Sequence, residues 1–439
     1  MDVMTVILFD ATRLLRRGGR RSPTGIDRVV LSYARWLTDQ PGVTIIPVWT
    51  WGEKVIRITD RRFTAIMRSA MIAGAPVADA PRHPQWAQLM RALSADGGPD
   101  PALRPPKVRR VYGQVAYQRI RVGLRFLRSF AAMTLPSGAI YLNVGHSGLE
   151  TARLLARLDK AGVRSLVMIH DLIPIAYPEF CGPGAAERHH RRMMTTLSHA
   201  ALILTNSQTT AQDVREYADR HAMETPPILV APLGLESAFE RSSRPPLAAL
   251  PYFVCVGTIE PRKNLVMLLK IWRRLADVLG DSTPQLVLVG RRGWENETVL
   301  DHLQRSPPVR QFVHEIADLS DDELATLMQN ARALLAPSAA EGFDLPVLEA
   351  LAMSTPVIAS DIPAHRELAR NAELLDPTDG PAWFRAISEA IVRPPRRPAP
   401  FTPLTWAEHF RIVEQAITLT KSGAATASIA YPVSRLREG

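Results

Sequence analysis

The sequence contains only two cysteines, Cys181 and Cys255, among 439 residues. Two isolated cysteines cannot build a disulfide framework or a cysteine-rich zinc cluster, which excludes the classes of protein that depend on either. No apolar run approaches the roughly 18 residues that span a bilayer, so no membrane span is predicted. The opening MDVMTVILFD is interpreted as a first strand, because no basic region precedes its short apolar run as in a secretory signal. A cytoplasmic protein is therefore expected.

Acidic residues are missing altogether between Pro101 and Leu149, and the whole chain carries a formal net charge of +10. This charge favours an acidic partner such as nucleic acid, an anionic membrane surface or a phosphorylated substrate. Within the window, Arg121, Arg125 and Arg128 share one helical face beside apolar residues. Such a basic amphipathic helix either rests on anionic lipid or packs on its own domain as a solvated surface. Aromatic residues make up only 6% and do not interleave with the basic residues, which disfavours nucleic acid.

Short apolar runs alternate with helical stretches along most of the chain, which predicts βαβ units and an α/β fold with mostly parallel sheets. The length suggests two or three domains, and a Pro- and Ser-rich stretch near residues 241–250 is interpreted as a linker. We therefore expect two Rossmann-like domains, residues 1–240 and 250–400, facing a central cleft. The remaining expectations are a basic helical insertion at about 55–135, an amphipathic helix at 401–420 and a flexible tail at 421–439.

The stretch EGFDLPVLEA places Glu341 and Glu349 around the start of a predicted helix. It follows the predicted strand ARALLAP, so both carboxylates fall at the carboxyl end of a strand, where open α/β sheets bind ligands. Pro346 suits the first helical turn, and the amides of Gly342 to Leu345 together with the helix dipole would form an anion site. Carboxylates for a diol beside amides for a phosphate predict a nucleotide sugar. On spacing alone, Glu341 could equally be a surface acid and Glu349 a residue that complements the helix dipole.

Polar side chains follow other predicted strands as well. VGTIEPRKNL places Arg262 and Lys263 after the first strand of the second half, and two adjacent cations suit a diphosphate. In the first half, Thr24 and Gly25 would let a backbone approach a ligand closely. An Arg-Lys pair is usually a solvated surface, and a single histidine is usually structural. The shared position of these groups at strand ends nevertheless favours one site. Further polar residues at strand ends are His170, Asp171, Asn206 and Ser207.

These motifs resemble the retaining glycosyltransferases of family 4, which have the two-domain GT-B fold. EGFDLPVLEALAMSTPVIASDIPAHREL is similar to the donor-site region of that family, and Glu341 and Glu349 match its E-x7-E motif. VGTIEPRKN, HDLIPIAYPEF, TNSQTT and APLGLESAF are similar to further loops of the family in the same order. The resemblance implies that the helix at 401–420 crosses back toward the first domain. The VGTIEPRKN and TGIDRV forms resemble bacterial mannosyltransferases of surface polysaccharide synthesis.

The resemblance also implies a role for each matching residue. Glu349 would hold the ribose hydroxyls of the donor, Glu341 would contact the donor sugar ring, and His170 would lie beside the reacting centre. Asp344 would lie next to the sugar, and Asp171 and Asn206 are accessory candidates. The residues implied to surround the donor diphosphate are Arg262, Lys263, Gly25, Gly342, Phe343 and Leu345.

Two positions depart from the family pattern. Thr258 stands where many members have Arg, so Arg262 or Arg291 would have to supply that phosphate contact. Asp344 replaces a commoner Gly, which either alters sugar preference or simply caps the helix.

The implied reaction moves a hexose, with mannose from GDP-mannose or a related donor as the best candidate, to a glycan or polyprenyl-diphosphate-linked acceptor. No D-x-D motif lies where a metal-dependent enzyme would need it, so we expect cationic side chains to replace a metal and no cofactor besides the donor. Retention without an obvious nucleophile favours front-face attack, in which the leaving phosphate accepts the proton of the acceptor. The enzyme would act in the cytoplasm, either free or on the inner membrane face. The alternatives are a sugar-nucleotide epimerase of similar fold and a catalytically dead transferase that binds membrane or nucleic acid.

Overall fold

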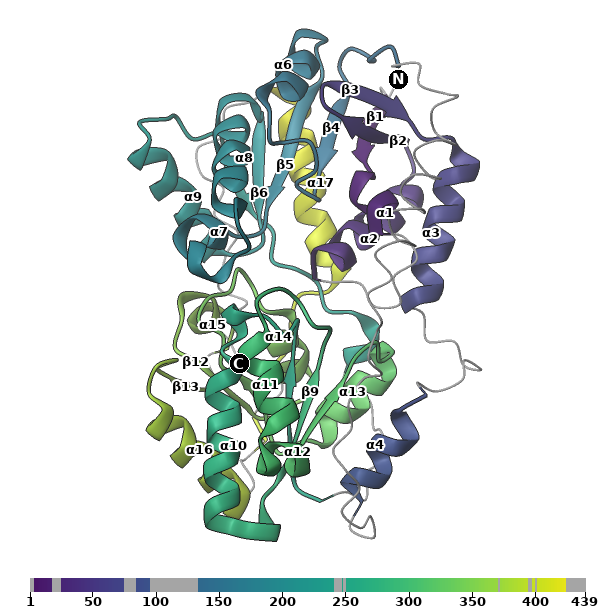
Figure 1. Cartoon of the computed structure of the whole chain (residues 1–439). Coiled ribbons are helices and arrows are strands. Elements are labelled where there is room, and N and C mark those ends of the chain that lie inside the picture. Colours follow the sequence, from purple (N-terminus) through teal and green to yellow (C-terminus); the bar gives the residue numbers. More distant parts are fainter. Residues whose placement is uncertain are drawn as a thin grey trace.

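The computed structural model describes residues 4–17, 25–74, 84–94, 133–240, 247, 250–369, 372–393, 397–398 and 401–423. These residues form two α/β domains, one above the other in Figure 1, each built on its own sheet. The prediction of two parallel-sheet domains is confirmed. The basic window at 101–132, most of the predicted linker and the tail beyond Gly423 lie outside the described residues.

The first domain contains a seven-stranded sheet with the order β3-β2-β1-β4-β5-β6-β7. Its neighbouring strands pair in parallel, except that the edge strand β3 runs antiparallel to β2. The strands are β1 (Thr5–Asp10), β2 (Val43–Trp51), β3 (Lys54–Arg57), β4 (Ile140–Asn143), β5 (Arg164–Ile169), β6 (Leu202–Thr205) and β7 (Ile228–Val230). The helices are α1 (Thr12–Arg17), α2 (Gly25–Thr38), α3 (Asp60–Gly74), α4 (Trp86–Leu93), α6 (Ala152–Lys160), α7 (Ile173–Ala176), α8 (Ala185–His199) and α9 (Gln208–Arg220).

The second domain contains a fully parallel six-stranded sheet with the order β10-β9-β8-β11-β12-β13. The strands are β8 (Tyr252–Val256), β9 (Gln285–Val289), β10 (Val313–Ile316), β11 (Leu334–Ala336), β12 (Val357–Ser360) and β13 (Glu373–Leu375). The helices are α10 (Leu265–Leu279), α11 (Glu297–Arg305), α12 (Pro307–Phe312), α13 (Asp321–Asn330), α14 (Leu345–Ala352), α15 (Pro363–Leu368) and α16 (Gly380–Val392). A capping box opens α13, in which Ser320 Oγ accepts from the Glu323 amide at 3.3 Å and the Glu323 carboxylate accepts from the Ser320 amide at 3.0 Å.

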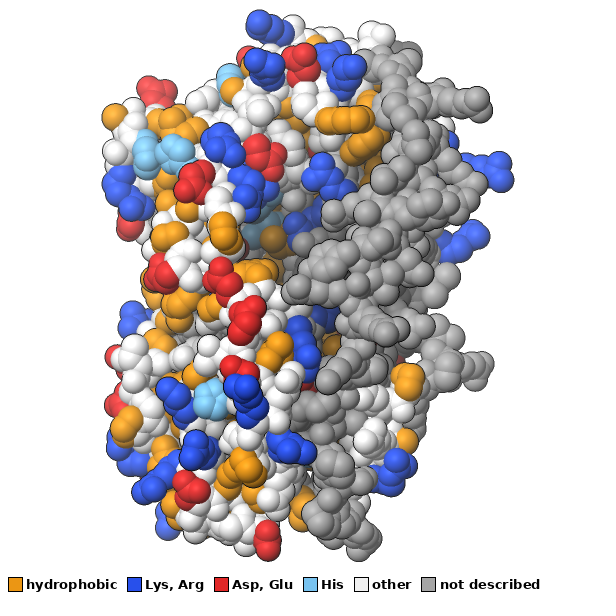
Figure 2. Space-filling view, viewed as in Figure 1, with side chains coloured by type: hydrophobic (Ala, Val, Ile, Leu, Met, Phe, Trp, Pro, Cys, Tyr) orange, Lys and Arg blue, Asp and Glu red, His pale blue; other side chains and the backbone are white. Residues whose placement is uncertain are grey.

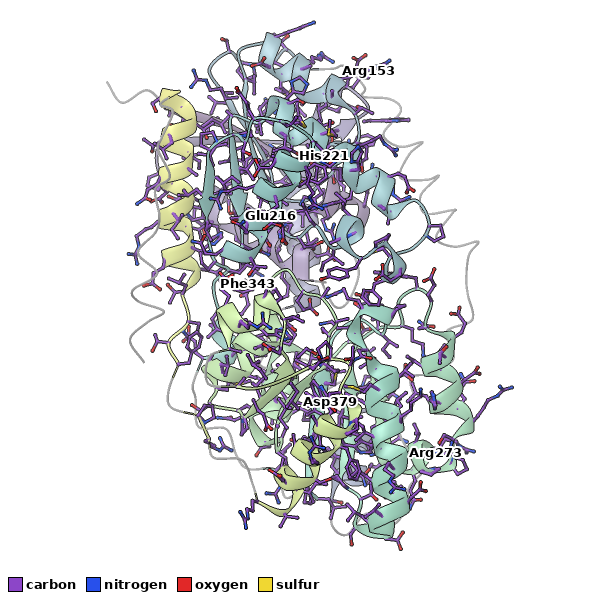
Figure 3. All side chains as sticks on the ribbon, turned by 90° about the vertical axis from the view of Figure 1, so that its left-hand side faces the viewer. Arg153, Glu216, His221, Arg273, Phe343 and Asp379 are labelled. Carbon is purple, nitrogen blue, oxygen red and sulfur yellow. The ribbon has the colours of Figure 1, made fainter. Side chains whose placement is uncertain are left out.

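The last helix of the described chain, α17 (Trp406–Ser422), packs against β4, β5 and β6 of the first domain. It is the yellow helix beside the upper domain in Figures 1 and 3. Its Phe410 stacks on Trp36 with ring centroids 4.5 Å apart, and its His409 hydrogen-bonds the Tyr33 hydroxyl at 2.9 Å. Leu235 forms a parallel bridge with Thr405, so two segments cross side by side between the domains. Residues from the beginning and from the end of the described chain therefore both contribute to the first domain.

Part of the expected insertion at 55–135 is described, and it is not helical throughout. Residues 54–57 form β3, in which buried Val55 and Ile56 lie between exposed Lys54 and Arg57. α3 and α4 follow it. Figure 1 shows α4 beside the second domain, and its Leu93 carbonyl accepts a hydrogen bond from the Leu250 amide at 2.6 Å. A segment of the first half thus reaches the second domain.

Candidate active site between the two domains

The loop that follows β11 touches the first domain directly, at the edge where a cleft was expected. A Cβ at Gly342 would collide with the His170 carbonyl oxygen and come within 2.9 Å of the Asp171 Cβ, so only glycine fits there. Ser207 Oγ donates to the Gly342 carbonyl at 2.9 Å. Figure 3 shows Phe343 at the level where the two domains meet. The carboxyl ends of the two sheets therefore face each other in contact.

A second contact between the domains lies beside this loop. The amides of Gln208 and Thr209, at the start of α9, donate to the two carboxylate oxygens of Glu367 in α15 at 2.8 and 2.9 Å. The Thr209 hydroxyl donates to the same carboxylate at 2.9 Å. A carboxylate at a helix N-terminus is favourable because it accepts from unpaired amides and complements the helix dipole. This contact fixes the second domain against the first on the β6 side of the junction.

Glu341 lies between two cations of its own domain. Lys263 Nζ donates to one carboxylate oxygen at 2.6 Å, and Arg262 forms an ion pair with the other. The Glu341 side chain is only 8% exposed, so it is not a surface acid. Burial by itself raises the pKa of Glu341, but Arg262 and Lys263 outweigh burial and hold the pKa well below its usual range. Glu341 is therefore ionised across the whole physiological pH range.

The turn after β8 is shaped to bring Arg262 and Lys263 to this carboxylate. Gly257, with φ +149°, leaves room for the Lys263 side chain, since a Cβ at Gly257 would come within 2.7 Å of Lys263 Cε. Arg262 is held by Glu260 at 2.8 Å and donates to the Ala340 carbonyl at 2.8 Å. The motif VGTIEPRKN thus places two cations beside the Glu341 loop, as the sequence predicts.

Glu349, in the second turn of α14, is paired with a residue of the first domain. Arg28 of α2 places Nη1 2.6 Å from Glu349 Oε1, and the Glu349 side chain is 1% exposed. Burial, with smaller contributions from the carboxylates of Asp321 and Glu236, raises the pKa of Glu349 to about 7 against the opposing effect of Arg28. Sequence reasoning missed Arg28, although it lies in the TGIDRV stretch. The sequence feature that could have identified Arg28 is its position one helical turn after Gly25, in the helix that follows the carboxyl end of β1.

The raised pKa of Glu349 predicts a pH-dependent contribution to stability. Because its folded pKa is about 7 and its ordinary value is 4.5, folding takes up a proton between these values. The contribution is fully present below pH 4.5 and lost as the pH rises through 7, an effect of about 3 kcal/mol. We expect the difference in unfolding free energy between wild type and Glu349→Gln to fall by this amount between pH 4.5 and 8 in urea titrations. A pH-independent difference would contradict the raised pKa.

Asp344 does not cap α14, contrary to one of the two expectations for it. Its backbone is left-handed, with φ +70°, and its side chain makes no capping hydrogen bond. Instead its carboxylate accepts from His365 Nε2 at 3.0 Å and lies 3.9 Å from Lys263 Nζ. Aspartate tolerates the left-handed region better than most residues, which explains how a non-glycine residue occupies this position. Its carboxylate is thus part of the charge network around Lys263.

The first-domain candidates lie opposite these groups. His170, after β5, is buried and donates from Nε2 to the Val144 carbonyl at 2.9 Å. Burial lowers the pKa of His170 to about 4, so it is neutral at pH 7. Gly25 begins α2, and a Cβ built on it would lie 3.9 Å from Leu345 Cδ1 of the other domain. Asp171 accepts from the Ile173 amide at 3.1 Å, and Asn206 is buried with no partner for its Oδ1 among the described residues.

The two remaining candidates, Arg291 and Thr258, have other neighbours. Arg291 pairs with Asp318, with Nε 2.5 Å from the carboxylate. Thr258 packs beside Gly293, since a Cβ built on Gly293 would come within 2.8 Å of Thr258 Cγ2. Arg262 and Arg291 were the two arginines expected to make the phosphate contact in place of Thr258. Of these two, Arg262 lies beside Glu341.

Charged side chains of both signs lie on the surface of the two domains. Figure 2 shows Lys and Arg side chains scattered over both domains and mixed with Asp and Glu, without one dominant basic patch among the described side chains in this view. No helix in the described ranges is long and apolar enough to cross a membrane. Nor does any group of three or more His, Cys, Asp or Glu within those ranges have an arrangement that could hold a metal ion.

Solved structures of low sequence identity share this architecture. Anabaena HepE in complex with UDP-glucose superposes with a TM-score of 0.57 at 15% identity and covers 94% of this chain and 100% of its own. Sucrose-phosphate synthase from Thermosynechococcus elongatus gives a TM-score of 0.54 at 17% identity, covering 95% and 97% of the two chains. The chain therefore has the two-domain GT-B fold, as its resemblance to family 4 implied.

The second domain also has a sequence match. Residues 250–392 match the family model described as "Glycosyl transferases group 1". The serotype-specific mannosyltransferase WbdA of Escherichia coli is 29% identical over 239 residues, which cover 49% of this chain and 29% of WbdA. The O-antigen chain mannosyltransferase RfbU of Salmonella typhimurium is 37% identical over 140 residues, covering 31% of this chain and 37% of RfbU. The chain thus matches well under two thirds of the length of either relative.

Proposed function

We propose that this chain is a retaining glycosyltransferase that moves a hexose, best assigned as mannose, from a nucleotide sugar such as GDP-mannose. One observation carries the proposal. Glu341 and Glu349 both lie at the junction of the two domains. Glu341 is paired with Arg262 and Lys263, and Glu349 is paired with Arg28 of the opposite domain. A diol and a diphosphate together require carboxylates and cations in this proximity. The relatives named as mannosyltransferases favour mannose over other hexoses.

The chemistry follows from where charge develops. Cleavage of the bond between the anomeric carbon and the diphosphate leaves negative charge on the phosphate and an oxocarbenium-like sugar. Lys263 and Arg262 would stabilise the phosphate, and the N-terminus of α14 adds its dipole. The phosphate would then take the proton of the acceptor hydroxyl on the same face of the sugar. In this scheme the two side chains supply the positive charge that a metal supplies in other transferases.

Donor binding requires these ion pairs to rearrange. Glu349 is 1% exposed and Arg28 occupies its Oε1, so ribose hydroxyls reach this carboxylate only if the contact between the domains changes, and Lys263 must share its charge between Glu341 and a phosphate. Arg28 has alternative carboxylates nearby, since Asp321 and Glu236 both act on it electrostatically. Movement of the second domain away from α2 would separate Arg28 from Glu349 and open the site. Closure over the bound donor would then exclude water from the reaction.

The acceptor proposed is a glycan or polyprenyl-diphosphate-linked oligosaccharide in surface polysaccharide synthesis. The O-antigen function in the names of the relatives supports this class. Work on such an acceptor would place the enzyme in the cytoplasm at the inner membrane face.

A thermal-shift screen against GDP, UDP, dTDP, ADP and their common sugars tests the donor. Binding to the native state alone stabilises it by about 2.7 kcal/mol when the ligand is at a hundredfold excess over Kd. We expect one nucleotide, best assigned as GDP, to raise Tm selectively. The shift should be lost in Glu349→Gln and kept in Glu414→Gln, an exposed glutamate of α17. No shift with any nucleotide, alongside salt-sensitive binding to anionic vesicles or RNA, would instead indicate a dead transferase.

Product analysis separates transfer from epimerisation. Incubation of the selected donor with and without an acceptor glycan should give nucleoside diphosphate and an extended glycan only when the acceptor is present. Conversion of the donor into a different sugar nucleotide without acceptor would identify an epimerase. The anomeric configuration of the extended glycan, read by NMR, tests retention.

A further inference from the structure

The loop after β4 holds a histidine in a strained and buried position. His146 has φ +60°, a left-handed conformation that costs a non-glycine residue free energy. The residue is only 7% exposed. Its Nε2 is buried without a hydrogen-bond partner among the described residues. Buried polar atoms without partners are rare, because each carries a desolvation cost. Two unfavourable features at one residue call for a functional explanation.

The strain is imposed by a network around the loop. The Asn143 amide donates to the Ser147 carbonyl at 2.8 Å, and its oxygen accepts from the Gly145 amide at 3.2 Å, so a single side chain brackets His146. Asn143 is fixed in turn through the Tyr141 hydroxyl, which donates to Asp10 at 2.5 Å. Each member of this network is buried. The loop conformation is therefore specified by the surrounding side chains and does not depend on His146 itself.

His146 lies in a cluster of neutral histidines beside the domain junction. Its ring centroid is 5.1 Å from that of His170 and 5.7 Å from that of His189. His170 and His189 each donate from Nε2 to a backbone carbonyl, which leaves Nδ1 of each neutral ring as an acceptor. Burial, with the neighbouring His170 and His189, lowers the pKa of His146, so it too is neutral at pH 7.

Two of the charged groups that act on the cluster are in ion pairs, and a third, Asp171, accepts a hydrogen bond from the Ile173 amide at 3.1 Å. Arg13 contacts Asp27 at 2.6 Å, and Arg192 contacts Glu150 at 2.6 Å. His170 and His189 therefore offer acceptor Nδ1 atoms and His146 offers an unpartnered Nε2, which suits an uncharged polar ligand such as a sugar hydroxyl better than an anion. The His170 backbone also contacts Gly342, next to Glu341, so the cluster borders the proposed donor sugar site from the first-domain side.

We propose that His146 is a second substrate-binding histidine, whose Nε2 hydrogen-bonds a hydroxyl of the acceptor sugar next to His170. This inference rests on the proposed glycosyltransferase function. It assigns the strained loop after β4 to acceptor recognition, while Glu341, Glu349 and Lys263 act on the donor. The loop strain is then maintained because it places the ring at the junction.

The test compares steady-state kinetics and stability of His146→Gly, His146→Asn and wild type. Glycine relieves the backbone strain, so His146→Gly should keep or raise Tm while the acceptor KM rises about tenfold, the equivalent of one lost hydrogen bond. The donor KM and the nucleotide-induced Tm shift should change less than about twofold. Asparagine tolerates the same backbone and keeps a polar side chain, so His146→Asn should recover part of the acceptor affinity. Ala222→Gly relieves a similar strain (φ +50°) at an exposed site and should leave all kinetic constants unchanged.

The outcomes separate the two levels of the proposal. If both His146 variants keep the wild-type acceptor KM while wild type binds a sugar nucleotide and transfers its sugar, the inference about His146 is wrong and the proposed function stands. A marked drop in Tm of His146→Gly, with kcat and both KM values falling or rising together, would assign His146 a structural role. A wild type that binds no sugar nucleotide would overturn the proposed function and this inference with it.

Discussion

Arg28→Met is expected to lower the free energy of unfolding by about 3–5 kcal/mol at pH 8, the usual cost of leaving a buried charge without its partner. Arg28 is the ion-pair partner of Glu349, which is 1% exposed. Asp321 and Glu236 act on the same group, so three carboxylates would share a site without their cation. At pH 5 the loss should be smaller, because Glu349, with its pKa near 7, is then protonated. Urea titrations at both pH values measure the effect.

Two controls define the cause of this loss. Arg153→Met removes an exposed arginine, labelled in Figure 3, and should cost less than about 0.5 kcal/mol. The double variant Arg28→Met, Glu349→Leu removes both charges and should recover part of the stability, since an apolar pair often replaces a buried ion pair without loss. A loss below about 1 kcal/mol in Arg28→Met at pH 8 would show that water or other groups stabilise Glu349 when the domains separate.

Lys263→Met is expected to lower kcat/KM for transfer by about 10²–10³-fold, the range found when one preorganised donor to a developing negative charge is removed. Lys263 is 7% exposed and is shared between Glu341 and Asp344, so its ammonium is fixed before the donor arrives. Methionine keeps the length and apolar contacts of the side chain, and Arg262 still neutralises Glu341 in the variant. The enzyme should therefore remain folded. Lys270→Met, an exposed position on α10, is the matched control and should retain full activity.

A nucleoside-diphosphate binding measurement separates the two contributions of Lys263. A parallel loss in nucleotide affinity and kcat/KM would mean that the lysine binds the diphosphate equally in the ground and transition states. A loss confined to kcat would place its effect on the leaving phosphate. Unchanged kcat/KM in Lys263→Met would remove Lys263 from the proposed mechanism and leave Arg262 as the phosphate-binding side chain.

Much of the second domain could be predicted from the sequence, because its central strands are buried on both faces and form continuous apolar runs such as YFVCV and QLVLV. The loops that leave these strands carry the chemistry, so Lys263 and Glu341 were predicted to lie at one edge and are 2.6 Å apart. Strand β10 was not predicted. Its sequence VHEI includes His314 and Glu315, which are buried only because Gln285 and Arg292 provide partners from elsewhere in the domain.

The contacts between the domains could not be predicted from the sequence in the same way. Arg28 looks like an ordinary helical arginine until the fold brings α2 to α14, and the raised pKa of Glu349 results from its burial, against the opposing effect of Arg28. Asp344 shows the same limit. Aspartate before a helix usually caps it, whereas here the backbone is left-handed and the carboxylate turns to His365. Tertiary partners decided each outcome, and local propensity did not.

The position of α17 has a consequence for how the chain folds as it is synthesised. The sheet of the first domain is complete once β7 has emerged, but the side chains on the face that α17 covers, among them Tyr33, stay without Phe410 and His409 until the second domain has been translated. The second domain is continuous and can fold as a unit. The first domain leaves the ribosome first but completes its packing last. Until α17 is synthesised, the apolar face that this helix covers must be kept from associating with other chains.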